Sequence, residues 1–338
     1  MSNAKFGVGI IGCGLIGRKR AHALGSARLV ACADLIPERA QALARTEPGA
    51  LATADWRDIL ERPDVDIVIV ATTNDTLAKV GRAALEAGKH VLVEKPAARN
   101  ARELEPVIEA AQRSQVQARV GFNHRYHPAL RKAHELHAEG LLGELMFVRG
   151  RYGHGGRLGY EKEWRADPAM SGGGELIDQG IHLIDLARWF LGDFSEVQGF
   201  AHTYFWQMPV DDNGFMMLKT PQQQVAFLHV SCTEWKNLFS LEIYGKNAKL
   251  HIEGLGGSYG VERLAYYRML PDEMGPPETT IWEYPMADMS WQVEFAEFLE
   301  DIKLGRKPSA SLEDAHAALR VVEAIYQGSD HAFASGIQ

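Results

Sequence analysis

Two carboxylates and an imidazole recur at helical spacing in the second half of the chain: Asp178, His182 and Asp185. Residues three or four apart in a helix lie on one face, so these side chains can address one point beside the helix. A carboxylate with an imidazole can take a proton from a hydroxyl group, which is general acid–base chemistry. The same set could instead ligate a metal ion, and His182 could simply be a core histidine.

A lysine stands at a position where a second functional group is useful. Lys95 follows Val91–Glu94, a predicted strand, and precedes Pro96. Ligands of open α/β sheets bind at the carboxyl ends of the strands, where an ammonium group can donate a hydrogen bond to a reacting oxygen and favour its anionic form. The simpler interpretation is a solvated lysine at a strand end.

The segment Gly12–Gly17 has the GxGxxG pattern, directly after an apolar strand and at the start of a helix. Gly12 permits the tight turn, Gly14 lets the backbone approach a pyrophosphate, and Gly17 lets the helix lie against the sheet. The helix then presents backbone N–H groups to the phosphates, beginning with Leu15 and Ile16. The pattern in this context predicts a dinucleotide site; outside it, the glycines would indicate only a surface loop.

An aspartate indicates which dinucleotide fits. Asp34 ends the second predicted strand, where a carboxylate accepts hydrogen bonds from the adenosine ribose diol. Arg18 and Arg39 could approach a 2′-phosphate, but Asp34 would repel it. We therefore expect NAD, with NADP less favoured.

The elements that position these residues change in character along the chain. From Phe6 to Phe122, short apolar strands alternate with helical segments, which predicts parallel βαβ units. Gly88 has the position of a helix-ending glycine, and Asn100 with Glu103 has the spacing of a capping box.

After Asn123 a helix is predicted over residues 128–139, a strand over 145–152, and a long helix over 174–191. Strands then follow strands from residue 196 to residue 253, which predicts an antiparallel sheet. Two helices, over 290–304 and 312–327, close the chain.

The bulk composition bounds the protein class. A chain of 338 residues with 46% hydrophobic and 24% charged residues is an ordinary globular protein, large enough for two domains. A net charge of -8 without long basic runs argues against nucleic acid as a partner. Three scattered cysteines provide neither a disulfide framework nor a zinc site. Without a bilayer-length apolar segment or a signal-peptide layout, we expect a cytoplasmic protein and no membrane partner.

The sequence resembles the glucose-fructose oxidoreductase and inositol dehydrogenase family, also called Gfo/Idh/MocA. The resemblance runs almost end to end, and its Glu-Lys-Pro and Asp-x-x-x-His elements are more specific than the glycine turn. One position departs, because many members carry a histidine near Leu77. The matching segments are Gly12–Gly17, Ala71–Asn74, Ala84–Pro96, Gly121–Asn123 with Arg125, and Gly172–Gly174 with Asp178, His182 and Asp185.

This resemblance implies an α/β protein with an N-terminal Rossmann parallel sheet, residues 1–123, and a C-terminal α/β domain with a large, mostly antiparallel open sheet, residues 124–338. The open sheet implies a homo-oligomer, a dimer or tetramer. In such proteins Lys95 would contact the substrate hydroxyl, His182 would act as general acid or base, and Asp178 would orient the substrate or the histidine, without a metal. Further cofactor contacts are implied for Thr72, Thr73, Asn74, Glu94, Lys95 and Asn123.

The expected substrate is a sugar, nucleotide-sugar or cyclitol oxidised at a secondary hydroxyl. The stretch from Arg149 to Arg157 mixes cations, aromatics and glycines, which suits a polyhydroxylated ring, although a structural loop would look the same. Trp235, with Glu234 and Asn237, lies at another strand end and is equally ambiguous. The substrate-binding candidates besides Lys95, Asp178 and His182 are Arg125, Tyr152, His154, Trp164 and Arg165.

Three other functions are compatible with parts of this pattern. Some relatives are glycosidases that use NAD for transient oxidation, and these would cleave a glycoside without net NADH release. Others bind NAD to regulate transcription without turnover, but such proteins are expected to lack the Lys95 or His182 that this chain retains. A pure interaction protein would bind no nicotinamide.

Overall fold

The structure is a computed structural model that describes residues 6–270 and 275–329. The chain folds into two compact units. The first contains the chain up to Phe122 together with Trp291–His316, and the second contains Asn123–Ser290 together with the chain from Ala317 onward. Residues 291–316 thus pack with the first unit, although the sequence-based division places them in the second domain. The functional boundary at residue 123 stays a prediction.

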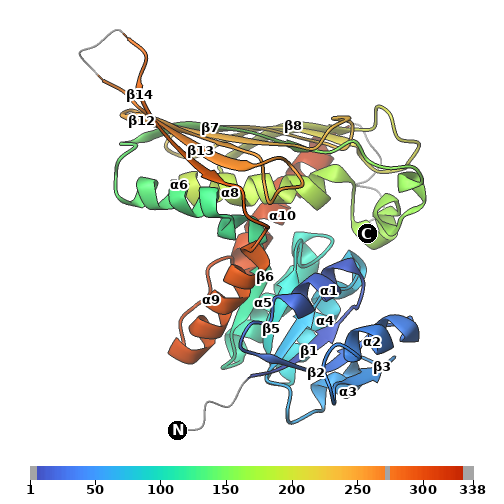
Figure 1. Cartoon of the computed structure of the whole chain (residues 1–338). Coiled ribbons are helices and arrows are strands. Elements are labelled where there is room, and N and C mark those ends of the chain that lie inside the picture. Colours follow the sequence, from blue (N-terminus) through green and yellow to red (C-terminus); the bar gives the residue numbers. More distant parts are fainter. Residues whose placement is uncertain (1–5, 271–274, 330–338) are drawn as a thin grey trace. The chain divides into compact units, whose positions relative to one another are not determined.

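The first unit is built on a parallel sheet of six strands in the order β3-β2-β1-β4-β5-β6 (Figure 1). All residues of β1 and β4 are buried, as expected for a parallel sheet covered on both faces. The predicted parallel βαβ units are confirmed, whereas the short β3 was not predicted. The strands are β1 Gly7–Ile11, β2 Arg28–Ala33, β3 Leu51–Thr53, β4 Ile67–Val70, β5 His90–Glu94 and β6 Ala118–Gly121.

The helices of this unit begin and end largely where local signals place them. Gly88 has φ +74° just after α4, and the Asn100 side chain accepts a 2.9 Å hydrogen bond from the Glu103 N–H. Glu103 returns its bond to the Arg99 N–H at 3.1 Å rather than to that of Asn100. The helices are α1 Leu15–His22, α2 Pro37–Ala44, α3 Arg57–Leu60, α4 Asn74–Glu86, α5 Ala101–Arg113 and α9 Ser290–Leu304.

Helix α9 belongs to this unit because of its apolar side chains. Phe295, Phe298 and Leu299 join the core formed by residues of β1, β2 and β4. Burial of one such side chain contributes about 1.5–3 kcal/mol. A sequence division at a single residue cannot represent a helix that returns from a distant part of the chain.

The second unit is built on an eight-stranded sheet in the order β14-β13-β12-β11-β7-β10-β9-β8, antiparallel except for the β7–β10 pair. The expected mostly antiparallel sheet is confirmed. The edge strand β14 and its neighbour β13 were not predicted; most residues of β14 are exposed and show no apolar alternation. The strands are β7 Leu145–Gly153, β8 Glu196–His202, β9 Asn213–Lys219, β10 Val225–Ser231, β11 Leu238–Gly245, β12 Ala248–Glu253, β13 Glu262–Arg268 and β14 Glu278–Tyr284.

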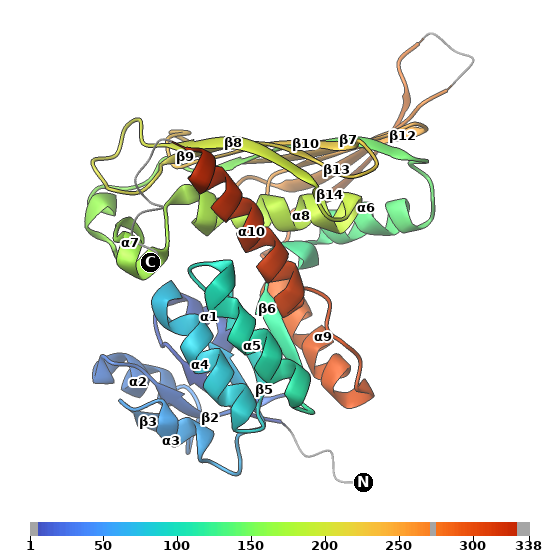
Figure 2. The ribbon, with the colours of Figure 1, turned by 180° about the vertical axis from the view of Figure 1, so that it is seen from behind.

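Helices cover one face of this sheet, and among the described residues none covers the other, here called the bare face (Figure 2). The covering helices are α6 Pro128–Ala138, α8 Ile181–Leu191 and the later part of α10 Leu312–Gly328. A Cβ at Gly150 of β7 would lie 3.0 and 3.1 Å from the Leu228 and Leu241 side chains of the neighbouring strands, so the packing on this face leaves little room for a side chain there. The remaining short elements are the turns Asn123–Tyr126, Tyr160–Lys162 and Trp164–Ala166 and the helix α7 Pro168–Ser171.

The predicted helix over 174–191 is interrupted in a way that matters for the site. Residues Leu176–Gly180 form a π-helical turn, and the regular helix α8 starts only at Ile181. Such turns are rare and occur frequently at functional sites. Asp178 lies within this turn. Within the described ranges, no helix combines the length and the apolarity that crossing a membrane requires.

Candidate active site

The glycine turn after β1 contains two glycines that the fold needs and one that it does not. Gly12 has φ +93°, and a Cβ at Gly17 would lie 1.9 Å from the Gly12 carbonyl oxygen. A Cβ at Gly14 would meet nothing within 4 Å, and its φ of −69° suits any residue. The space above Gly14 is therefore open to a ligand that lies close to the backbone.

The start of α1 matches the charge of a diphosphate. Gly14 is the N-cap, and within the described part of the chain no side chain caps this end. The first N–H groups of a helix lack intrahelical partners and carry a partial positive charge, so a phosphate satisfies them well. Leu15 is 63% exposed, which leaves this terminus accessible.

Asp34 links the turn to the end of β2. Its Oδ2 accepts a hydrogen bond from the Cys13 N–H at 2.7 Å, and its Oδ1 accepts one from the Ile36 N–H at 2.8 Å. These bonds hold a carboxylate beside the exposed end of the strand, where a ribose diol can donate to it. The open space at Gly14, the uncapped helix and this carboxylate together fit NAD.

Lys95 follows a strand end that is fixed by a buried ion network. Arg20 of α1 is fully buried; its Nε donates to Glu94 Oε1 at 2.6 Å, and another guanidinium nitrogen pairs with Glu294. Its guanidinium also lies 4.4 Å from the Trp291 ring centroid. Burial raises the pKa of Glu294, although the charge of Arg20 acts in the opposite direction. One carboxyl oxygen of Glu94, a predicted cofactor contact, is thus held by Arg20.

The chain turns sharply after Lys95, which is itself partly exposed. Ala97 is buried with φ +73°, and its N–H donates to the Glu94 carbonyl oxygen at 2.9 Å. Such a backbone conformation is costly for a residue with a Cβ, and it places Lys95 on a tight turn at the carboxyl end of β5.

The remaining predicted cofactor residues of this unit follow β4. Thr73 is the N-cap of α4 and donates from Oγ1 to Asp75 at 2.6 Å. Thr72 is partly exposed and Asn74 is buried. Leu77, where many family members carry a histidine, is fully buried in α4. All predicted cofactor residues of the first unit thus lie at the carboxyl ends of β1, β2, β4 and β5, in the turns after them, or at the starts of the helices that follow.

In the second unit, the π turn brings Asp178 into an ion pair. The Arg165 Nε donates to Asp178 Oδ2 at 3.1 Å, and the Arg165 guanidinium lies 4.6 Å from the Trp164 ring centroid. The side chain of Asp178 is 16% exposed, so it remains accessible at the surface of a mostly buried cluster.

His182, one turn further on, is buried against a second histidine. Its ring stacks on His124 with centroids 3.7 Å apart, and the Tyr152 ring lies edge-on at 6.4 Å. Burial raises the pKa of Tyr152 well above its usual value, so the phenol stays protonated. The structure thus groups the predicted His182 and Tyr152 with His124, which sequence reasoning missed.

The predicted substrate contact His154 pairs with a carboxylate that sequence reasoning missed, Glu175. Glu175 is buried, with His154 Nε2 3.4 Å from its Oε1 and the Tyr160 hydroxyl 3.5 Å from its Oε2. Burial raises the pKa of Glu175. Burial acts to lower the pKa of His154, but the hydrogen bond and charge of Glu175 outweigh it and raise that pKa. The spacing from Glu175 to Asp178 could have indicated this carboxylate.

Arg125 and Asp185 form a buried ion pair. Arg125 donates to both carboxyl oxygens of Asp185, at 2.8 and 2.6 Å, and both side chains are buried. The second carboxylate of the predicted helical face thus points at Arg125, a predicted substrate contact whose role stays a prediction. The predicted cofactor residue Asn123 is also buried and donates to Ser290 Oγ at 2.9 Å. In residues 6–270 and 275–329, no three histidine, cysteine or carboxylate side chains are arranged to hold a metal ion.

The sheet orders and the open glycine turn define a dinucleotide-binding α/β protein with a second, open-sheet unit. Residues 6–122 match a family model described as an oxidoreductase family with an NAD-binding Rossmann fold, and residues 130–251 match the GFO/IDH/MocA C-terminal domain. The chain belongs to the Gfo/Idh/MocA family of oxidoreductases, and its first unit is an NAD-binding Rossmann domain.

Named relatives include two dehydrogenases. A levoglucosan dehydrogenase of Pseudarthrobacter phenanthrenivorans is 33% identical over 236 residues, which are 63% of this chain and 58% of that protein. An inositol 2-dehydrogenase of Salmonella typhimurium is 26% identical over 309 residues, 89% of this chain and 87% of that protein. The structure of a levoglucosan dehydrogenase in complex with NADH superimposes with a TM-score of 0.87 at 25% identity, covering 96% of this chain and 98% of that one.

Proposed function

We propose that the protein is an NAD-dependent dehydrogenase that oxidises a secondary hydroxyl of a sugar, nucleotide-sugar or cyclitol. The observation that carries the proposal is the cluster in which Asp178, held by Arg165, lies one helical turn before the buried His182. The named levoglucosan and inositol dehydrogenases support the substrate class.

Each side chain has a definite task in this reaction. Bound NAD supplies the hydride acceptor. Lys95 donates a hydrogen bond to the reacting hydroxyl oxygen and stabilises its developing negative charge. His182 takes the hydroxyl proton, and Asp178 orients the ring by accepting hydrogen bonds from its hydroxyl groups.

The surroundings of His182 favour this role. His124 stacks on one face of the imidazole, and Tyr152 borders it, so the ring has a fixed orientation. A fixed imidazole can meet a hydroxyl proton without a costly rearrangement. Arg165 similarly restricts the Asp178 carboxylate to one direction.

The test measures NAD reduction, as the absorbance of the NADH formed, with myo-inositol, levoglucosan, D-glucose and UDP-glucose as substrates. We expect activity with at least one of them, and a loss of about 10²-fold or more in kcat for Lys95→Ala and for His182→Ala. NAD affinity, measured by calorimetry, serves as the control for His182→Ala and should not change. Near-normal turnover in both variants would refute the assignment, and glycoside cleavage without NADH would favour the glycosidase alternative.

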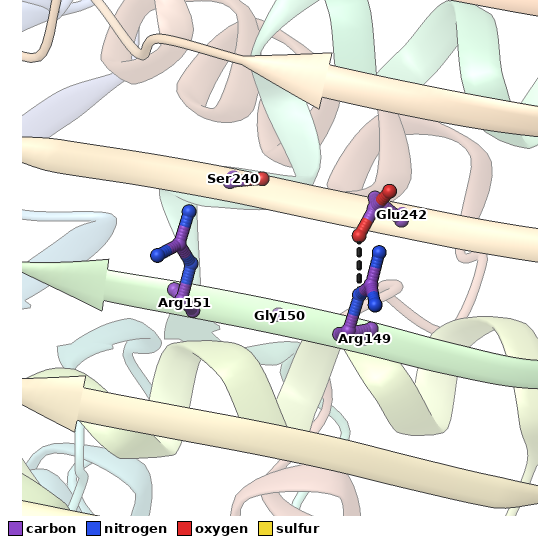
Figure 3. Close-up of a pocket in the computed structure, with 5 residues that line it drawn as sticks. All are labelled: Arg149, Gly150, Arg151, Ser240 and Glu242. Atoms are coloured by element: carbon purple, nitrogen blue, oxygen red, sulfur yellow. Dashed lines mark hydrogen bonds and ion pairs between the residues drawn. The ribbon is translucent and has the colours of Figure 1, made fainter.

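We also propose that the bare face of the eight-stranded sheet joins copies of this chain. Phe200, Met217 and Phe227 project from it with exposures of 67%, 51% and 53%. Beside them lies a shallow polar hollow lined by Arg149, Gly150, Arg151, Ser240 and Glu242 (Figure 3). Exposed apolar side chains next to paired charges suit a protein interface.

Light scattering tests this assembly. We expect a dimer or tetramer, and we expect Phe227→Glu to shift it toward the monomer because the change places a charge in an apolar contact. The matched control is Leu35→Glu, at an exposed position of the first unit. A monomeric wild-type protein would contradict the proposal.

A further inference from the structure

Two aromatic rings of the second unit are exposed to solvent in an arrangement that does not favour folding. Trp235 is 70% exposed and has φ +57°, and Phe205, 52% exposed, meets it edge-on with centroids 4.7 Å apart. The left-handed conformation is unfavourable for a residue with a Cβ. Exposure also forgoes most of the benefit of burying an indole ring. Folding of this chain gains little from that arrangement, which indicates a ligand.

The backbone that carries Phe205 is held in place before any ligand arrives. The buried Asp212 accepts hydrogen bonds from the N–H groups of Tyr204, Phe205 and Trp206 at 2.9, 2.7 and 3.0 Å. The Trp206 indole N–H in turn donates to the Cys232 carbonyl oxygen at 2.9 Å. A surface fixed in this way loses little conformational entropy on binding.

The segments that carry these rings adjoin the glycine-rich loop that carries His154. A Cβ at Gly156 would lie 2.3 Å from the Trp206 ring, and one at Gly155 would lie 3.2 Å from the Trp235 backbone. The two glycines therefore let this loop pass directly against the tryptophans. From the sequence, these glycines belong to a stretch predicted to suit a polyhydroxylated ring, with a structural loop as the alternative.

A continuous series of contacts connects these rings with the π turn of Asp178. Trp206 meets Tyr160 with centroids 5.7 Å apart, and the Tyr160 hydroxyl lies 3.5 Å from Glu175, which precedes Asp178 by nearly one turn. These packed side chains link the segments that carry Trp235 and Phe205 to the segment that carries Asp178 within the second unit.

We propose that Trp235 and Phe205 form an aromatic platform for a second sugar ring, so that the enzyme acts on glycosides of at least two rings. The proposal rests on the proposed dehydrogenase function. Gln207, Lys236 and Asn237 lie within two residues of Phe205 or Trp235 in the sequence and are exposed. A sugar ring has an apolar face of C–H groups and a rim of hydroxyls, so it matches an aromatic face bordered by hydrogen-bonding side chains better than an apolar protein surface does.

The test compares one-ring and two-ring substrates in the full-length protein with NAD. The probes are D-glucose, maltose and cellobiose, measured as kcat/KM for the wild type, Trp235→Ala and Trp235→Phe. We expect Trp235→Ala to lower kcat/KM for the preferred disaccharide about tenfold, mainly through KM, and to leave glucose within about twofold. Trp235→Phe should keep most of the disaccharide activity. Trp282→Ala, on the edge strand β14, is the matched control and should change neither.

The outcomes separate the platform from the underlying reaction. Equal effects of Trp235→Ala on glucose and disaccharide, no effect on either, or a change in oligomeric mass would each overturn the platform. If the wild type oxidises none of the three sugars, the proposed function fails with these substrates. Sugar binding to the NAD-loaded protein, measured by calorimetry, then tests the aromatic platform independently of turnover. Tighter binding of a disaccharide than of glucose, lost in Trp235→Ala, would support it; equal binding would overturn it.

Discussion

Replacement of Gly14 by alanine should separate cofactor binding from folding. A Cβ at this position meets no protein atom within 4 Å, and the backbone angles suit alanine. Alanine has fewer backbone conformations than glycine in the unfolded chain, so the change should leave the free energy of unfolding unchanged or raise it by about 0.4–1 kcal/mol. The new methyl group occupies the space that the diphosphate needs, so we expect NAD affinity to fall by about 10–100-fold, or about 1.4–2.8 kcal/mol.

Gly17→Ala is the matched control, because its Cβ would lie 1.9 Å from the Gly12 carbonyl oxygen. Here the backbone must shift, and we expect the protein without cofactor to lose about 1–3 kcal/mol. The two glycines belong to one turn, yet one change should impair binding and the other folding.

Thermal unfolding with and without NAD, combined with calorimetry, measures both effects. At an NAD concentration about 100-fold above the wild-type Kd, bound cofactor stabilises the wild type by about 2.7 kcal/mol. A variant with about 100-fold weaker affinity would gain only about 0.4 kcal/mol under the same conditions. Gly14→Ala protein that binds NAD like the wild type, or that melts far below it without cofactor, would refute the reasoning.

Three further changes test other parts of the structure. Arg125→Met should cost about 3–5 kcal/mol in urea unfolding, because the Asp185 charge stays buried, and a second change Asp185→Leu should restore much of the loss. Burial, with His137 and Arg125, lowers the pKa of His134 to about 4. In the unfolded chain this imidazole titrates at about 6.5, so between that pH and 4 the unfolded state binds a proton that the folded state does not. The contribution of His134 to the free energy of unfolding is therefore highest above about pH 6.5 and falls as the pH is lowered toward 4. His134→Gln should make urea unfolding less sensitive to pH in this window. Asp34→Ala should weaken NAD binding and reduce its preference over NADP about tenfold in calorimetry, since the ribose diol loses its acceptor.

Much of the first unit could be predicted because its signals are local. The glycine turn, the strand before it and the helix after it occupy one short stretch, and Asp34 follows in the next strand. The capping residue Asn100 and the helix-ending Gly88 also act on their immediate neighbours. The conformation at each of these positions follows from the residues beside it.

The parts that were missed depend on contacts between distant residues. His124 and His182 stack only because two separate segments of the chain meet in the fold, and no residue spacing in the sequence predicts that contact. The residue pattern indicates Arg125 and Asp185 only as polar residues near a site, whereas the fold pairs them in the interior. The π turn at Leu176–Gly180 replaces a regular helix that the residue pattern favours, and only the packing around it reveals the difference.

The most direct test of the proposed reaction follows the hydrogen atom itself. The protein is incubated with NAD and a sugar or cyclitol deuterated at its ring carbons, and the reduced cofactor is examined by mass spectrometry. We predict that the reduced cofactor carries one deuterium from the substrate carbon and that Lys95→Ala slows its formation by about 10²-fold or more. A protein that binds NAD but transfers no deuterium from myo-inositol, levoglucosan, glucose or UDP-glucose would contradict the proposed function.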